Sequence, residues 1–430
     1  MDKITKGMLD YVWKSCSPYH AVNNLITELD KKGFIRLEEA DAWKLKAGGR
    51  YYVTRNGSAI ISFKVPGKDY KGFLMTASHS DSPSFKIKEN PELRRMDAYV
   101  SLNVEGYGGM LDGPWFDRPL SVAGRVYVKG RGSSINMKLV NVDKDLVMMP
   151  SLAIHMNREA NKGYSFNAQK DMIPLYGSAD APAFMETIAE VAGVKASSIL
   201  GSDLFLYNRV APSVWGASSE YISASRLDDL ECVYTTFRGF MEAENDKYVC
   251  LHCVFDNEEV GSGTRQGAAS TFLKDTLIRI GDSMGRSSED YYRSIAGSFM
   301  LSADNAHAVH PNYSDKADPV NRPFMNKGIV IKYNANQRYT TDGASEAVLK
   351  YILNKAGIPY QAFTNRSDMP GGSTLGNISS TQIPVRTVDI GLAQLAMHSP
   401  YETAGALDPS FMARGAEAFY RSDVSLRTQL

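Results

Sequence analysis

The stretch GFLMTASHSDSP, residues 72–83, joins a short apolar run to a polar segment that contains His79 and Asp81. The apolar run has the length and composition of a buried strand. The stretch YVCLHCVF, residues 248–255, has the same character and leads into the acidic segment DNEE, residues 256–259. In an open α/β sheet, binding sites form just beyond the carboxyl ends of the strands. The two stretches therefore predict an α/β sheet with histidine and acidic residues gathered at one edge.

The same residue types follow four predicted strands, over residues 72–77, 248–255, 298–303 and 385–390. His79 and Asp81 follow the first of these strands, and Glu258 and Glu259 follow the second. Asp304, His307 and His310 follow the third, and His398 follows the fourth. Asp228 begins a predicted helix over residues 227–244. Each residue alone has an ordinary explanation as a loop residue or helix cap, but together they predict a shared cleft. A cleft of carboxylates and imidazoles suits two divalent metal ions about 3.5–4 Å apart, bridged by one carboxylate, and requires no thiolate.

Two local patterns within this set suggest roles. A metal-bound imidazole usually donates its other N–H to a carboxylate, so Asp81 is expected to orient His79. The adjacent Glu258 and Glu259 suit a division of labour, in which one glutamate binds a metal and the other is the general base for the attacking water.

The length of 430 residues exceeds what one hydrophobic core usually supports, so two structural units are expected. The segments 1–92 and 213–430 alternate predicted strands and helices, including helices over 343–356 and 409–421. They predict a mixed-sheet α/β catalytic domain with helices on both faces. The segment 93–212 reads as a β-rich insert with one helix, over 181–192, and is expected to mediate oligomerisation.

Composition narrows the range of partners and compartments. The 48 Lys and Arg balance the 48 Asp and Glu, which argues against a nucleic-acid partner. No apolar stretch is long enough for a membrane span, and no apolar core follows the charged N-terminus. The four cysteines form no disulfide framework, which favours the cytoplasm. Cys250 and Cys253 lie within a predicted buried strand, so packing is expected of them rather than metal binding.

The motifs, taken together, resemble those of the aspartyl aminopeptidase family of di-zinc metallopeptidases along nearly the whole chain. They are SPYHA at 17–21, HSDSP at 79–83, SRLDDL at 225–230, DNEEVGS at 256–262, DNAHAVHPNY at 304–313 and AMHS at 396–399. Asp229 stands where the family commonly has Asn, and the segment 367–374 lacks a cysteine often found there. The second difference bears on substrate preference more than on metal chemistry.

The resemblance implies a role for each candidate residue. His79 and Asp304 would be terminal ligands of one metal, Glu259 and His398 of the other, and Asp228 the bridging ligand. Glu258 would be the general base and Asp81 the orienting residue. His307 would lie in the substrate pocket, Lys332 would bind an acidic substrate side chain, and His155 would reach a neighbouring subunit's active site.

Further implications concern cofactor, substrate and assembly. The resemblance implies two divalent ions per subunit, zinc first with cobalt or manganese as alternatives, and peptide substrates with a free N-terminus. It also implies self-association through dimers, up to a dodecamer. Lys332 is expected at the end of a strand over 328–333, on the edge where the metal residues gather. The expected activity is removal of an N-terminal Asp or Glu.

Two other catalytic or binding motifs are incomplete in this sequence. GGSTL at 371–375 fails as a serine-hydrolase elbow because residue 375 is Leu. The glycine-rich segment 261–267 fails as a phosphate loop because no Gly-Lys-Ser/Thr follows it. A di-metal aminopeptidase of neutral, basic or broad specificity, a di-metal amidase or carboxypeptidase, and a non-catalytic homologue remain as alternatives.

Overall fold

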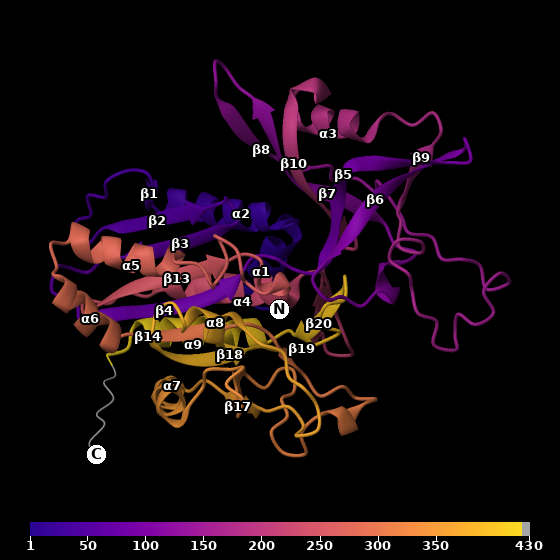
Figure 1. Ribbon diagram of the computed structural model, residues 1–430. Helices are drawn as coiled ribbons and strands as arrows, with labels where there is room; N and C mark the ends of the chain where they lie inside the picture. The colour runs from indigo at the N-terminus through magenta and orange to yellow at the C-terminus, as the bar shows by residue number, and fades with distance from the viewer. Residues whose placement is uncertain (424–430) are drawn as a thin grey trace.

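The computed structural model describes residues 1–423, which form a central sheet, an antiparallel sheet and a small sheet. The central sheet has the order β1 (Ile35–Leu37), β2 (Arg50–Arg55), β3 (Ala59–Lys64), β13 (Tyr248–Phe255), β4 (Gly72–His79), β14 (Phe299–Ala303), β18 (Arg386–Gly391), β16 (Ile329–Lys332) and β17 (Tyr360–Phe363) (Figure 1). Strands β13, β4, β14 and β18 run parallel to one another, so their carboxyl ends meet at one edge.

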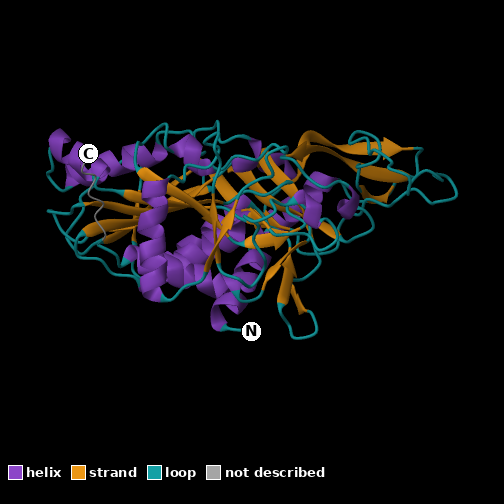
Figure 2. Cartoon of the chain, turned by 90° about the horizontal axis from the view of Figure 1, so that it is seen from below, coloured by secondary structure: helices purple, strands orange, loops and turns teal. Residues whose placement is uncertain are grey.

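Helices cover both faces of the central sheet, as the sequence predicts (Figure 2). One face packs against α1 (Lys3–Lys14), α2 (Pro18–Lys31), α4 (Leu227–Glu242), α7 (Gly343–Ala356) and α9 (Asp408–Tyr420). The other packs against α5 (Phe272–Ser283), α6 (Ser288–Ala296) and α8 (Leu375–Ser379). The mixed α/β class is confirmed.

Strand β13 shows how the two cores are separated. Cys250 packs into the core beneath α4 and α9, whereas Cys253 packs into the core beneath α5. Both cysteines are buried and free. Because they point to opposite faces of the sheet, they cannot ligate one metal ion together. The prediction that this pair is structural is confirmed.

The antiparallel sheet has the order β8 (Ile135–Asn141), β7 (Leu120–Lys129), β10 (Ile199–Asn208), β5 (Ser84–Arg95), β6 (Tyr99–Tyr107) and β9 (Leu175–Ser178). It packs with α3 (Phe184–Ala192) around its own core, and Figure 1 shows it beside the central sheet. Strand β5 begins at Ser84 and therefore runs across the boundary predicted after residue 92.

The small sheet lies next to the carboxyl edge of the central sheet. Its order is β11 (Ser213–Trp215), β12 (Tyr221–Ala224), β20 (Glu402–Gly405), β19 (Ala393–Leu395) and β15 (Ala306–His307). It connects the segments that follow β14 and β18 with the segment that precedes α4, and so brings distant parts of the chain to one place.

Candidate metal centre

The carboxyl edge of the central sheet borders a cavity of about 190 Å³. Most of the predicted site residues line it: His79, Asp228, Glu258, Asp304, His307, Lys332 and His398. The cavity is also lined by Tyr339, Phe363 and the loop 372–374. The structure therefore brings residues from four strand ends and one helix start into a single cleft.

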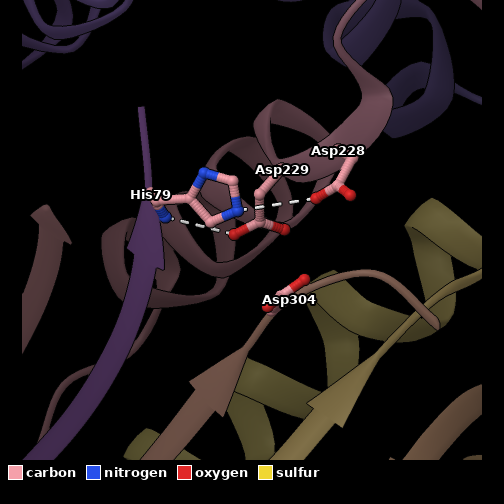
Figure 3. Close-up of side chains that lie close together, drawn as sticks. All are labelled: His79, Asp228, Asp229 and Asp304. Carbon is pink, nitrogen blue, oxygen red and sulfur yellow. Dashed lines mark hydrogen bonds and ion pairs between the residues drawn. The ribbon is translucent and has the colours of Figure 1, made fainter. Parts of the chain in front are cut away.

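Candidate ligand atoms form three clusters, and Asp228 belongs to two of them. One contains His79, Asp228, Asp229 and Asp304, and another contains Asp228, Glu259 and His398. The third contains His79, Glu258 and Glu259. Within each cluster the candidate ligand atoms lie within 4.8 Å of one another. Figure 3 shows the first cluster, with the His79 ring directed toward Asp228.

The two carboxylate oxygens of Asp228 face different histidines. His79 Nε2 lies 3.5 Å from Asp228 Oδ1, and His398 Nε2 lies 3.5 Å from Asp228 Oδ2. His398 Nε2 also lies 3.4 Å from Glu259 Oε2. This arrangement is the one a bridging carboxylate requires, with one oxygen available on each side.

Backbone geometry places these side chains. His79 ends β4, and its backbone N–H donates to Asp229 Oδ2 at 3.1 Å. Glu259 lies in the helical turn Glu258–Val260 that follows β13. His398 lies between β19 and β20 with a φ of 65°, a left-handed conformation that is uncommon outside glycine and is frequent at functional sites.

Asp81 holds both glutamates as well as His79. Its carboxylate accepts the backbone N–H groups of Glu258 and Glu259, each at 3.1 Å, and the hydroxyl of Tyr107 at 2.7 Å. His79 Nδ1 lies 3.0 Å from the Asp81 carbonyl oxygen and 3.4 Å from Asp81 Oδ1. The sequence predicts a contact between His79 and the Asp81 carboxylate, whereas the hydrogen bond is to the Asp81 backbone carbonyl and the carboxylate lies farther away. The structure adds the support of the two glutamates.

Buried acidic groups at this site lack enough donors. Within residues 1–423, Asp228 Oδ1, Asp229 Oδ1 and Glu259 Oε1 are buried without a hydrogen-bond partner. Burial raises the pKa of Glu258 to about 7, and burial together with Asp228 raises the pKa of Glu259 well above its ordinary value. Buried unpaired carboxylates are costly unless a cation neutralises them. The oxygen and imidazole donors fit a borderline divalent ion such as zinc.

Lys332 lines the cavity, although it does not end a strand on the carboxyl edge as the sequence suggests. Strand β16 runs antiparallel to β18, so its carboxyl end points away from the edge where the metal residues gather. The end of the strand is therefore not on that edge, and this part of the expectation about Lys332 is wrong. The long side chain nevertheless places Nζ 2.7 Å from the carbonyl of Asp304, 3.2 Å from that of Asn305 and 3.8 Å from Asp304 Oδ1.

The two remaining histidines of the predicted site differ in location. His307 lines the cavity and its ring lies near Phe363, with 6.2 Å between ring centroids. His155 is exposed in the segment between β8 and β9, and it does not line the cavity of its own chain.

Sequence reasoning missed residues that act on the backbone of the site. Glu402 accepts the backbone N–H groups of Asp228 and His398. Tyr107, from the antiparallel sheet, donates to Asp81. Neither belongs to a motif of metal ligands, and the residue type alone gives no indication of these contacts.

An α/β sheet whose carboxyl edge gathers buried carboxylates and imidazoles around a cavity has the architecture of a metal-dependent hydrolase. The profile of the family described as Aminopeptidase I zinc metalloprotease (M18) matches residues 11–420. The chain therefore belongs to the M18 family of zinc metallo-aminopeptidases.

Individual relatives agree with this assignment. The chain is 44% identical over 427 residues to the protein of Clostridium acetobutylicum named Probable M18 family aminopeptidase 2, covering 97% of this chain and 98% of the relative. Ape4, solved in complex with Nbr1, is 36% identical with a TM-score of 0.94, covering 97% of this chain and 85% of that one. The mApe1 dodecamer of S. cerevisiae is 26% identical with a TM-score of 0.85, covering 97% and 96%. Among the described residues, no helix combines the length and apolar character needed to cross a bilayer.

Proposed function

We propose that this aminopeptidase uses two metal ions and preferentially removes an N-terminal Asp or Glu from peptides. The position of Asp228 supports the two-metal part most strongly, because it belongs to two of the three clusters of candidate ligands and has one oxygen facing His79 and the other facing His398. In this proposal His79 and Asp304 complete one site, and Glu259 and His398 complete the other. Zinc is the proposed metal, and cobalt and manganese are the alternatives.

The bound metals would supply Lewis-acid chemistry, polarising the scissile carbonyl and lowering the pKa of the attacking water. Glu258 lines the cavity, and its carboxylate also lies within reach of a metal ion held by His79 and Glu259. In this proposal Glu258 stays outside both metal sites. It can accept the proton of the attacking water and return it to the leaving amine. Asp81 holds the backbone of Glu258 in place through the hydrogen bond to its N–H.

Lys332 supports the proposed preference for acidic residues. An ammonium group has three N–H donors, and carbonyl oxygens of Asp304 and Asn305 accept two of them. The third is available to a substrate carboxylate in the cavity, whose lining includes Lys332 and Tyr339. Because Lys332 is only 2% exposed, such a pair would form away from bulk water, where it discriminates most strongly.

The segment 93–212 is proposed as an oligomerisation domain, and His155 as a residue that reaches a neighbouring subunit's site. Leu152, Ile154 and Met156 flank His155 and are 58%, 48% and 70% exposed. Exposed apolar side chains grouped on one segment are typical of a contact surface. A dimer-based assembly, up to the dodecamer known for mApe1 of S. cerevisiae, would cover them. The four buried free cysteines support a cytoplasmic location.

A peptide panel tests the function directly. The metal-free protein is reconstituted with zinc, cobalt or manganese and assayed on peptides beginning with Asp, Glu, Leu or Lys, each with a free or acetylated N-terminus. The proposal predicts fast release of Asp and Glu from free N-termini only. Preference for Leu or Lys would support broad specificity, and cleavage of acetylated peptides would support a different amidase. Absence of hydrolysis with every metal would support a non-catalytic homologue.

A further inference from the structure

The buried carboxylate of Glu402 connects two of the proposed metal ligands through their backbones. Glu402 begins β20 and is 1% exposed. Its Oε2 accepts the N–H of Asp228 at 3.0 Å, and its Oε1 accepts the N–H of His398 at 2.8 Å. These residues come from the start of α4 and from the connection between β19 and β20, which are 170 positions apart in the chain.

Each of these N–H groups depends on a side-chain acceptor. Asp228 lies near the start of α4, where its backbone is not helical (φ −81°, ψ 107°) and its N–H has no carbonyl partner within the helix. His398 lies in a connection with a left-handed backbone. A buried N–H without an acceptor costs about 1–3 kcal/mol, so one carboxylate satisfies two groups that would otherwise be left unpaired.

The same carboxylate joins a chain of buried amides that reaches a third proposed ligand. Gln394 Nε2 donates to Glu402 Oε1 at 3.4 Å, and Asn305 Nδ2 donates to Gln394 Oε1 at 2.9 Å. Asn305 directly follows Asp304. The backbones that carry Asp228, His398 and Asp304 are therefore linked by hydrogen bonds through Glu402.

We infer that Glu402 is a positioning residue, which holds the backbones of Asp228 and His398 so that the cation site is already formed before a metal binds. The inference rests on the proposed function. In the part of the chain that the structure describes, Glu402 belongs to neither Asp228-containing ligand cluster. It therefore acts through the ligands it holds, as groups outside the ligand set commonly do in metalloproteins.

The chain contains a matched control for this arrangement. Asp408, at the start of α9, is also buried, and its carboxylate accepts the backbone N–H groups of Asn326 at 2.5 Å and Gly328 at 3.0 Å. Asn326 and Gly328 are not candidate ligands, and Asp408 does not line the cavity. Glu402 and Asp408 thus each accept two backbone N–H groups, Glu402 at the metal centre and Asp408 away from it.

The test compares Glu402→Gln with Asp408→Asn in the full-length protein. Each substitution keeps the shape of the side chain but replaces one acceptor oxygen with an N–H₂ group that faces a backbone N–H. Zinc affinity is measured by competition with a chelator, and the visible spectrum is recorded after loading with cobalt. We expect Glu402→Gln to weaken zinc binding by about 10–100-fold and to alter the cobalt spectrum. Asp408→Asn should lower the melting temperature while keeping wild-type zinc affinity.

Two results would overturn the inference: wild-type zinc affinity in Glu402→Gln, or an equal loss of affinity in both variants. Failure of the wild-type protein to bind zinc would instead defeat the proposed function. Hydrogen exchange on the metal-free wild-type protein gives a second test that does not require the variant to fold. Slow exchange of residues 226–229 and 397–399 without metal supports the inference, and exchange as fast as in exposed loops contradicts it.

Discussion

The antiparallel sheet shields an acidic group partly from water and the carboxyl edge of the central sheet shields several almost fully, and the partners of these groups differ. In the antiparallel sheet, Asp203 accepts a hydrogen bond from Lys86 at 3.0 Å and another from Arg125 at 2.9 Å, one at each oxygen. At the edge of the central sheet, Asp228 and Glu259 each keep a buried oxygen without a donor among residues 1–423. Asp203 therefore has a cationic partner at each oxygen, whereas Asp228 and Glu259 are left with an oxygen that a bound cation could neutralise.

The pKa values of Asp203 and Glu258 move in opposite directions. Burial alone would raise the pKa of Asp203, but its hydrogen bonds with Lys86 and Arg125 lower it below the ordinary value. For Glu258, burial raises the pKa to about 7, and nearby Asp304 adds to the effect. A paired acid therefore contributes to stability, whereas the unpaired cluster is a candidate for chemistry.

The largest expected effect is at the edge of the central sheet. Glu258→Gln should lower turnover by about 10²–10⁴-fold, because the variant cannot accept a proton from water. Its zinc content should stay close to that of the wild-type protein. The matched variant Glu259→Gln should instead lose zinc. Steady-state kinetics and metal analysis check both, and the reverse pattern would exchange the two roles.

The substitution Lys332→Met tests substrate choice in the same region. Removing the buried ammonium should reduce the preference for Asp over Leu by about 30-fold or more, which corresponds to ~2 kcal/mol for a desolvated charge pair. The ratio of kcat/KM for the two peptides measures this change. Exposed Lys327 provides the control, because Lys327→Met should leave the ratio unchanged. An unchanged ratio in Lys332→Met would show that Lys332 does not determine the preference for acidic residues.

His155 is the point where the two regions are expected to meet, across a subunit boundary. His155→Phe should lower kcat/KM by about tenfold, equivalent to ~1.4 kcal/mol of lost transition-state contact, with unchanged zinc content. Kinetics and sedimentation measured together check this prediction. A fully active monomer would show that no neighbouring subunit completes the site.

The smallest effect on activity is expected from removing the ion pair between Arg125 and Asp203. Arg125→Met should destabilise the protein by about 2 kcal/mol, since it leaves Asp203 with one of its two cationic partners. Zinc content and turnover should not change.

The stability contributed by Asp203 also depends on pH. Because the folded pKa of Asp203 is lowered, its contribution is present above the unfolded pKa of about 3.9 and is lost as the pH falls through the folded pKa. The difference in the free energy of unfolding between the wild-type protein and Arg125→Met, measured with denaturant, should therefore become smaller below about pH 4. A constant difference would mean that Arg125 acts through packing rather than charge.

The parts of the fold that the sequence predicts are those with strong local patterns. Strand β13 is found over the predicted residues, 248–255, because an uninterrupted apolar run bounded by polar residues leaves few alternatives. The direction of β16 depends on how the chain crosses the sheet, which the composition of the strand does not encode. The contribution of Glu402 is equally hidden, because its partners are backbone N–H groups that any residue type supplies.

The unpaired acids at the edge of the central sheet are proposed to hold two metal ions. Anomalous diffraction at the zinc absorption edge, on crystals of the zinc-loaded protein, tests it most directly. We expect two zinc peaks per subunit, one beside His79 and Asp304 and one beside Glu259 and His398, with Asp228 in contact with both. A single peak per subunit, or zinc bound away from Asp228, would contradict it.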